Sequence, residues 1–284
     1  MGTTRMRMDL AYDGTDFLGW AVQPGQRTVQ GEVEHWTTTV LRLDRPVGLV
    51  CAGRTDAGVH ARAQVAHVDL PTGTDPATLL RRLRRVLPGD VAVLGLREAP
   101  PGFHARFSAL WRRYVYRLVD GDRVGDPLQR GHVAEIRREI DVDRFNQAAA
   151  TLLGLHDFAP FCRRRAGATT IRTLQDVEAR RVCAGPLGSR VEVTVRADAF
   201  CHSMVRSLVG ALTAVATGQR DPGWLAAVAA SGRRHYQVQV MPARGLTLEE
   251  VRYPPDDELA SRAEEARSVR GPVAVDDEDV EGEE

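Results

Sequence analysis

The chain contains no lysine, and all 38 of its basic residues are arginine. The Walker A phosphate loop, the pyridoxal phosphate Schiff base and the β3 strand of protein kinases each require a lysine, so these chemistries are excluded. The sequence also lacks a GxGxxG dinucleotide motif, a GxSxG elbow, an HExxH motif and an EF-hand loop. The residues therefore give no support for a metal or nucleotide cofactor, and we expect none.

Long apolar runs and paired cysteines are missing as well. No segment approaches the roughly 18 apolar residues of a membrane span, and the first residues lack the apolar core of a signal peptide, so we expect a cytoplasmic protein without membrane contact. The four cysteines, Cys51, Cys162, Cys183 and Cys201, form no CxxC pair. We expect all four to be reduced, and most of them to be buried as small apolar side chains.

The net charge is zero, but the charge is unevenly distributed. Twelve acidic residues and three arginines follow from Asp256 onward, so residues 256–284 carry −9 and residues 1–255 carry +9. A basic body indicates a polyanionic partner. The acidic composition of residues 256–284 is typical of a disordered tail, and we predict one there.

Apolar periodicity and turn residues predict an α+β protein. Expected strands cover residues 5–11, 47–51, 64–70, 91–97, 108–119, 173–182, 191–196 and 246–253. Expected helices cover residues 28–43, with Thr28 as the cap, and 76–86, 143–153, 202–217 and 222–230. The order of these elements favours two α+β halves, residues 1–110 and 111–255, each with a sheet and helices on one side.

One carboxylate, Asp56, lies in the loop between the strands expected at 47–51 and 64–70. Gly53 and Gly58 flank it and permit tight turns that would fix its orientation. An aspartate beside a glycine usually only caps its own turn, so this pattern leaves a structural and a catalytic role open.

Residues 52–61, AGRTDAGVHA, resemble the signature of the tRNA pseudouridine synthase A (TruA) family. Further motifs follow in the order of that family: YDG at 12–14, GW at 19–20, TVQG at 28–31, LPGD at 87–90, FHARFS at 103–108, RYVY at 113–116, GLHDF at 154–158, HSMVR at 202–206 and GL at 245–246. The resemblance covers about residues 5–253. It implies a pseudouridine synthase fold, in which two ferredoxin-like halves share a joined, mostly antiparallel sheet with flanking helices.

The resemblance also implies an activity and a partner. Members of the family isomerise uridine to pseudouridine at positions 38, 39 and 40 of the tRNA anticodon arm, as homodimers and without a cofactor or metal. The matching residues assign Asp56 as the nucleophile, Arg206 as its cationic neighbour and Tyr114 as the tyrosine that contacts the substrate. Attack at the sugar C1′ and attack at C6 of the base would both use an ionised carboxylate, so the site of attack stays open.

Residue spacing adds detail around these positions. On a helix, His202, Arg206 and Gly210 share one face, and the small glycine would let the arginine point inward. Tyr116 shares a strand face with Tyr114, and we interpret it as core packing.

The remaining candidates are weaker. Arginine binds phosphate in a bidentate manner, so four residues are candidates for phosphate contacts: Arg54, Arg106, Arg112 and Arg113. Each of four histidines stands alone, and we interpret them as structural: His60, His104, His156 and His202. The chain departs from the common family pattern at Ala21, Arg84 and Val86, where RNA contacts could therefore differ.

Three alternatives remain open. The chain could be a pseudouridine synthase that acts on another RNA, or a non-catalytic RNA-binding protein on the same scaffold. A base-excising hydrolase would release free uracil, whereas a synthase returns an isomer of unchanged mass.

Overall fold

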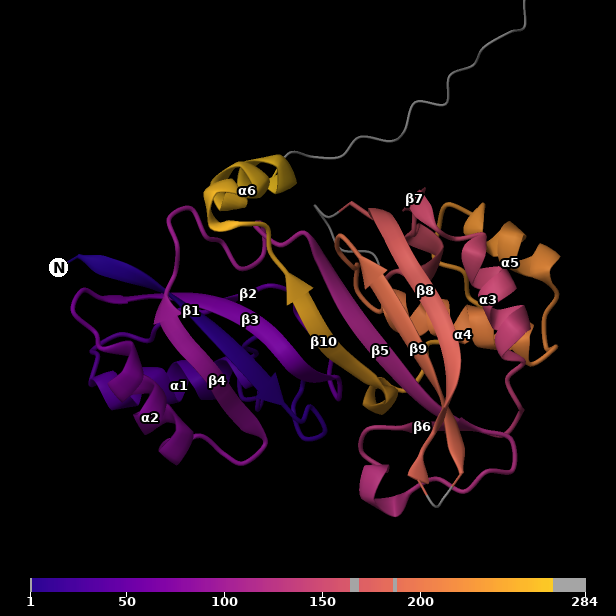
Figure 1. The fold of residues 1–284 in the computed structure, drawn as a ribbon, viewed down its shortest axis with the longest axis horizontal. Coiled ribbons are helices and arrows are strands. Elements are labelled where there is room, and N and C mark those ends of the chain that lie inside the picture. The colour runs from indigo at the N-terminus through magenta and orange to yellow at the C-terminus, as the bar shows by residue number, and fades with distance from the viewer. Residues whose placement is uncertain (1, 164–168, 186–187, 268–284) are drawn as a thin grey trace, which may run out of the picture.

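The computed structural model describes residues 2–163, 169–185 and 188–267. Its strands form one ten-stranded sheet, in which eight strands follow the order β4-β1-β3-β10-β5-β9-β8-β7 (Figure 1). The strands are β1 (Thr3–Tyr12), β2 (Val50–Cys51), β3 (His60–Pro71), β4 (Val91–Glu98), β5 (Trp111–Asp120), β6 (Ala134–Ile136), β7 (Gly154–Asp157), β8 (Ile171–Cys183), β9 (Ser189–Ala197) and β10 (Leu246–Arg252). All pairs are antiparallel except β10 with β3 and β5 with β6. This confirms the α+β class and the joined, mostly antiparallel sheet.

The described residues include six α-helices: α1 (Val29–Leu41), α2 (Pro76–Val86), α3 (Val142–Ala150), α4 (Met204–Ala216), α5 (Pro222–Ala229) and α6 (Leu259–Arg267). Helices α1 and α2 lie beside the N-terminal strands, whereas α3, α4 and α5 lie beside the C-terminal strands (Figure 1). Thr28 caps α1 as expected, because its side chain accepts a hydrogen bond from the amide of Gly31. Asp75 caps α2, whose buried Leu79 and Leu83 are spaced as one helix face.

Strand β1 shows why the N-terminal half folds as a sheet. Its alternate residues Met6, Met8, Leu10 and Tyr12 are buried, which is the period-two pattern of a strand with one face toward a core. In the C-terminal half, eleven residues of α4 are buried. Arg206 on this helix is therefore largely surrounded by protein, and its side chain is 19% exposed.

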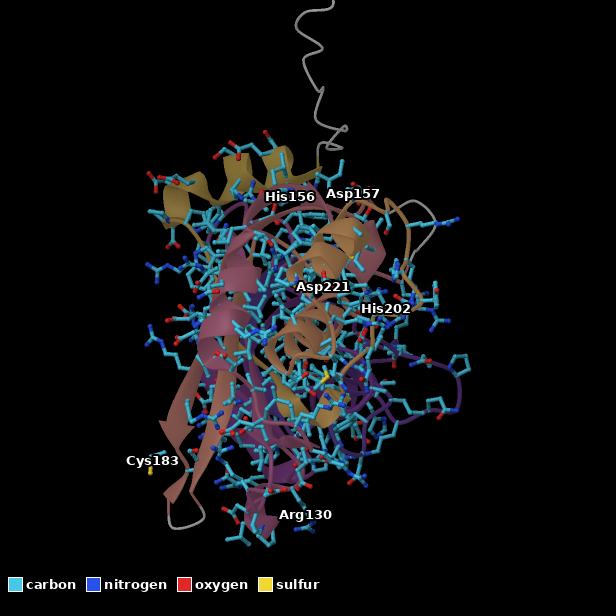
Figure 2. All side chains as sticks on the ribbon, turned by 90° about the vertical axis from the view of Figure 1, so that its right-hand side faces the viewer. Arg130, His156, Asp157, Cys183, His202 and Asp221 are labelled. Carbon is cyan, nitrogen blue, oxygen red and sulfur yellow. A yellow bond between two sulfur atoms is a disulfide. The ribbon has the colours of Figure 1, made fainter. Side chains whose placement is uncertain are left out.

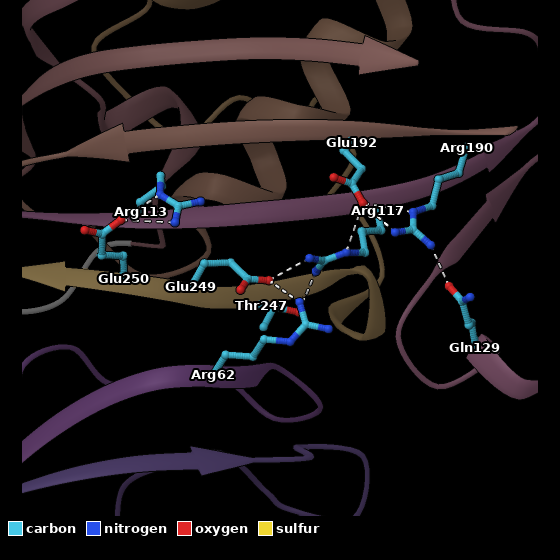
Figure 3. Close-up of polar contacts among 9 residues, drawn as sticks. All are labelled: Arg62, Arg113, Arg117, Gln129, Arg190, Glu192, Thr247, Glu249 and Glu250. Atoms are coloured by element: carbon cyan, nitrogen blue, oxygen red, sulfur yellow. Dashed lines mark hydrogen bonds and ion pairs between the residues drawn. The ribbon is translucent and has the colours of Figure 1, made fainter. Parts of the chain in front are cut away.

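Strand β10 joins the two halves. It lies between β3 and β5, and a chain of ion pairs crosses this joint (Figure 3). Glu249 accepts hydrogen bonds at 2.9 Å from Arg62 and at 2.7 Å from Arg117. Arg117 also lies 3.4 Å from Glu192, which pairs with Arg190 at 2.7 Å. Side chains of β3, β10, β5 and β9 are thus linked in one polar network, and the expected division at residues 110 and 111 falls just before β5.

Some element predictions differ from the structure. The strand expected at 47–51 shortens to Val50–Cys51, because side chains of α1 bind the preceding backbone. The hydroxyl of Thr38 accepts from the amide of Val47, and the carboxylate of Glu34 accepts from the amide of Leu49. Short strands β6 and β7 carry too little periodicity to be predicted, and neither was expected.

The disordered tail predicted over 256–284 is wrong for its first part. Asp256–Glu258 form a 3-10 turn, and α6 follows at Leu259–Arg267. Leu259 is buried, and its carbonyl accepts a hydrogen bond at 3.0 Å from the hydroxyl of Ser108. Two apolar positions on one helix face therefore outweigh the acidic composition, and residues 268–284 lie outside the described residues.

The expectation of four reduced cysteines is also wrong. Cys162 and Cys201 form a disulfide, with their Cα atoms 5.7 Å apart. Their separation of 39 residues hides this proximity in the sequence. Cys51 is free and buried, and Cys183 is free and exposed. In the part of the chain that the structure describes, no helix is long and apolar enough to cross a membrane.

Candidate active site

The Asp56 loop connects β2 to β3, and neighbouring segments hold it in place. The carbonyl of Thr55 accepts a hydrogen bond from the amide of Trp20 at 3.0 Å, and the Thr55 hydroxyl lies 2.8 Å from the hydroxyl of Tyr12. Gln64 donates to the carbonyl of Gly53 at 2.7 Å. Because these partners come from β1, β3 and the segment before α1, the loop has a fixed position relative to the sheet.

Glycines at two points make this close packing possible. Gly19 has a φ of +93°, and a Cβ atom there would lie 2.9 Å from the carbonyl oxygen of Thr55. Gly58 has a φ of +75°, a conformation that favours glycine and turns the chain into β3. The GW and AGRTDAGVHA motifs therefore meet in space.

The carboxylate of Asp56 faces the beginning of α4. Its Oδ2 lies 3.4 Å from Nη1 of Arg206 and accepts a hydrogen bond at 3.4 Å from the hydroxyl of Ser203. Its Oδ1 lies 3.3 Å from Nε2 of His202. The guanidinium and the helix N-terminus both stabilise negative charge at this position. The Asp56 side chain keeps 25% of its surface exposed, so one side of the carboxylate is open.

A second contact orients Arg206. Its Nε donates to the carbonyl of Met241 at 2.6 Å, and its own carbonyl accepts from the Met241 amide. The expectation that Gly210 makes room for the Arg206 side chain is wrong. A Cβ at Gly210 would lie 2.0 Å from the carbonyl oxygen of Gln239, so the glycine admits the backbone of the segment that ends at Met241.

Ser203 has an unusual backbone conformation. Its φ of +65° lies in the left-handed region, and Arg42 is the other non-glycine residue with positive φ among the described residues. Such strain costs of order 1 kcal/mol and is typical of functional positions that the surrounding structure holds in place. Ser203 donates to Asp56 from this conformation.

Tyr114 lies beside the Asp56 loop. A Cβ at Gly53 would be 3.9 Å from its hydroxyl, and the ring of Phe200 packs edge-on against its ring with centroids 5.2 Å apart. Tyr114 is only 6% exposed. Burial raises the pKa of Tyr114 and the negative charge of Asp56 adds to the rise, so the phenol stays protonated at neutral pH. Tyr116 is fully buried and donates to the carbonyl of Pro242, which confirms its assignment to the core.

The four candidate phosphate arginines divide into two groups. Arg54 and Arg106 are exposed, and the Arg106 guanidinium lies 5.2 Å from the centroid of the Phe107 ring. Arg113 pairs with Glu250 at 3.1 Å. Phosphate binding by Arg112 is excluded, because its side chain is buried and donates to three backbone carbonyls, those of Ala52, Arg106 and Asp198. Arg112 thus joins three loops around the site.

Comparison with known proteins identifies the family of this chain. A family model described as tRNA pseudouridine synthase matches residues 148–254. A tRNA pseudouridine synthase A of Cutibacterium acnes is 64% identical over 267 residues, which cover 94% of this chain and 95% of that protein. Proteins of the same name from Streptomyces griseus and Mycobacterium leprae are 54% and 51% identical, over 95% and 94% of this chain and 95% of each relative.

The chain belongs to the tRNA pseudouridine synthase A family. The motifs of that family, distant in sequence, converge here around Asp56: the hydrogen bonds from Ser203 and Arg206 span 147 and 150 residues. Arg84, one of the three departures from the common pattern, is engaged within its own half. It donates to the carbonyls of Val93 and Leu94, which ties α2 to β4.

Each of the four histidines interpreted as structural has a polar partner within the fold. His60 receives the amide of Gly14 at Nδ1, His104 receives the amides of Arg106 and Phe107, and His156 contacts the carbonyl of Leu153. The ring of His202 lies 3.3 Å from the carboxylate of Asp56. Figure 2 shows His202 on the same face of the C-terminal half as Asp221, which caps α5.

Sequence reasoning missed Ser203 and Phe200 as members of this site, and it missed the contact of His202 with Asp56. All three lie at or just before the start of α4, within or next to the HSMVR motif. Their closeness to Arg206 in the sequence could have indicated them, since the residues that precede a helix lie next to its first turn.

One further cluster has the composition of a metal site. Ligand atoms of Asp13, His60 and His132 lie within 4.8 Å of one another. Both ring nitrogens of His60 are already engaged, however: Nδ1 accepts from Gly14, and Nε2 lies 3.1 Å from the carbonyl oxygen of Arg244. These contacts fit a histidine that fixes the end of the Asp56 loop rather than a metal ligand.

Proposed function

We propose that the chain isomerises uridine to pseudouridine at positions 38, 39 and 40 of the tRNA anticodon arm, with Asp56 as the nucleophile. The observation that carries this proposal is the environment of one carboxylate. Asp56 is fixed by its loop, accompanied by the cation of Arg206 and open on one side. This arrangement suits an anionic nucleophile that attacks a substrate delivered from solvent.

The chemistry needs a single nucleophile and conserves all atoms. The N1–C1′ bond breaks, the uracil turns, and a C5–C1′ bond forms while the C5 hydrogen leaves as a proton and N1 gains one. Asp56 can form a transient ester at C1′, which the uracil anion displaces through C5, or a transient adduct at C6. Because no electrons are gained or lost, the proposed reaction calls for no redox cofactor.

His202 and Tyr114 fit distinct steps of this reaction. The C5 proton must pass to a base, and the His202 ring lies 3.3 Å from the Asp56 carboxylate, where a histidine can act as a general base. Tyr114 remains a phenol, so it serves as a hydrogen-bond donor to the substrate and not as a base. Uracil within a folded RNA must leave its stack to reach Asp56. Phe200 packs edge-on against the buried Tyr114 ring and is the more exposed of the two, so it supplies the aromatic surface for the flipped base.

We also propose that Arg54 and Arg106 bind phosphates next to the target. Both are exposed in loops that Arg112 fastens together, Arg54 near Ala52 and Arg106 through its own carbonyl. The excess of +9 over residues 1–255 supports an RNA partner. The resemblance to the family further supports a homodimer that acts in the cytoplasm.

The test is the variant Asp56→Asn, which keeps the size of the side chain and removes its charge. An unmodified tRNA transcript carrying tritium at uracil C5 is incubated with wild type and variant. We expect no tritium release by Asp56→Asn, with tRNA affinity within a few-fold of wild type. Residual turnover at a substantial fraction of the wild-type rate would contradict the nucleophile assignment.

Asp69→Asn is the matched control, because it removes one carboxylate that pairs with Arg5 at the surface. Its turnover should equal that of wild type. The alternatives give different products: a hydrolase releases free uracil, a non-catalytic binder releases no tritium, and a synthase for another RNA leaves the tRNA unchanged but modifies its own substrate.

A further inference from the structure

The loop that follows α5 presents an aromatic side chain to solvent. Tyr236 is 88% exposed, which is unusual for a large ring, and its neighbours Arg233 and Arg234 are exposed as well. Neither arginine forms an ion pair within the part of the chain that the structure describes. In contrast, the arginines of the sheet joint are paired with glutamates (Figure 3). The loop therefore combines an uncovered ring with two unpaired cations.

Contacts within the loop hold Tyr236 in this position. Its ring stacks on the ring of His235, with an interplanar angle of 13° and centroids 5.3 Å apart. The hydroxyl of Tyr236 accepts from Gln237, which in turn accepts at 3.0 Å from the indole of Trp224 on α5. The amide of His235 donates to the carbonyl of Pro160 at 3.1 Å. The ring is thus supported from behind by a defined set of neighbours.

The same loop leads directly to the active site. Five residues after Tyr236, Met241 accepts the hydrogen bond from Nε of Arg206, which contacts Asp56. A chain segment of five residues spans at most about 18 Å. Tyr236 therefore lies close enough to Arg206 for one RNA strand to reach both.

We propose that Tyr236 stacks on an unpaired nucleobase of the RNA substrate and that Arg233 and Arg234 bind the adjoining phosphates. The proposal rests on the proposed function, because it takes tRNA as the substrate, and it adds a binding site outside the reaction site. Aromatic rings that stack on bases next to arginines that bind phosphates are how proteins hold single-stranded nucleic acid. Stacking on His235 leaves the opposite face of Tyr236 for the base.

The test compares Tyr236→Ala with Tyr236→Phe in the full chain. The probe is an unmodified tRNA transcript with uridine in the anticodon arm, and the measurements are its Kd and the KM and kcat for tritium release. We expect Tyr236→Ala to raise Kd and KM about tenfold, because one base–aromatic stack is lost, and to leave kcat at saturating tRNA within twofold. Tyr236→Phe keeps the ring and should restore wild-type values.

Leu128→Ala is the control, because Leu128 is an equally exposed apolar side chain, at 89%, on a different element. The double variant Arg233→Gln with Arg234→Gln should reduce the slope of log affinity against log salt by about 1 for each phosphate contact. Unchanged Kd and KM in Tyr236→Ala would overturn the proposal, as would equal losses in Tyr236→Ala and Tyr236→Phe.

The wild-type protein separates this outcome from failure of the proposed function. If wild type forms no pseudouridine in the tRNA, the proposed function fails. If wild type forms pseudouridine and Tyr236→Ala is indistinguishable from it, only the stacking site fails. Thermal unfolding of each variant identifies any loss that comes from misfolding.

Discussion

The joint of the sheet and the cluster around Asp56 both pair arginine with a carboxylate, but the two regions differ in how the pairs are arranged. At the joint, Glu249 lies 2.7 Å from Arg117 and 2.9 Å from Arg62. At Asp56, the contacts to His202, Ser203 and Arg206 are 3.3 to 3.4 Å long. The Glu249 side chain is shared between two arginines and is only 11% exposed, whereas the Asp56 side chain keeps 25% of its surface accessible to a substrate. Exposure and partners, and not residue type, therefore separate a carboxylate that only links strands from one that a substrate can reach.

After Asp56→Asn, the largest effect is expected from Arg206→Gln. It removes the cation beside Asp56, and the loss of one preorganised charge contact typically lowers kcat by about 10²- to 10³-fold. Arg206→Lys keeps the charge but loses the fixed fork that also binds Met241, so a smaller loss is expected. Tritium release at saturating tRNA measures kcat for both variants. A kcat for Arg206→Gln close to that of wild type would show that the Arg206 cation does not assist Asp56.

Arg112→Met tests how much a buried arginine that binds backbone carbonyls stabilises the fold. It leaves three buried carbonyls without their donor, so we expect the free energy of unfolding to fall by about 3 kcal/mol. Urea unfolding measures this change. The control is Arg113→Met, which breaks a partly exposed pair with Glu250 and should cost less than about 1 kcal/mol. Equal stability of the two variants would show that the carbonyl contacts contribute little.

His67 makes the free energy of unfolding depend on pH. Burial and the positive charge of Arg5 lower its pKa from 6.5 to about 4, and its Nδ1 accepts from the amide of Ala105. Between pH 6.5 and 4 the unfolded chain binds a proton that the folded chain does not. Stability should therefore fall with decreasing pH, by at most about 1.4 kcal/mol per pH unit from this residue.

Unfolding measured at several pH values, for wild type and His67→Gln, isolates that contribution. The glutamine keeps an acceptor but does not titrate, so its stability should fall less steeply between pH 6.5 and 5. Parallel curves for the two proteins would mean that His67 is not held neutral by the fold.

The smallest effect is expected from Ser203→Gly. Glycine adopts a positive φ without strain, so stability should rise by up to about 1 kcal/mol. The same change removes the hydroxyl that donates to Asp56, and we expect a several-fold lower kcat. Thermal unfolding and tritium release on one preparation test both effects. A variant that is more stable and fully active would show that the conformation of Ser203 serves no catalytic purpose.

Local patterns predicted much of the fold. Helix α2 was expected at residues 76–86 and is found at Pro76–Val86, because its apolar spacing and the Asp75 cap act within a few residues. The strands β1, β4, β8 and β9 were likewise placed within a few residues of their bounds. Elements whose stability depends on distant partners were missed, as with α6, which is anchored by the Ser108–Leu259 contact over 151 residues.

The part of the candidate site that lies within the family motifs could be predicted from the sequence. The motif resemblance placed Asp56, Tyr114 and Arg206 together, but not the contact of His202 with Asp56 or the burial of Arg112. Those features depend on how α4 and three loops meet, which residue spacing does not specify. The disulfide between Cys162 and Cys201 was hidden for the same reason.

The position of β10 has a consequence for how the protein is made. A ribosome delivers β3 and β5 long before Leu246–Arg252, yet β10 must lie between them. Until it arrives, both strands present open edges that can pair with other chains. We therefore expect the nascent protein to depend on protection from aggregation until its last strand emerges and closes the sheet.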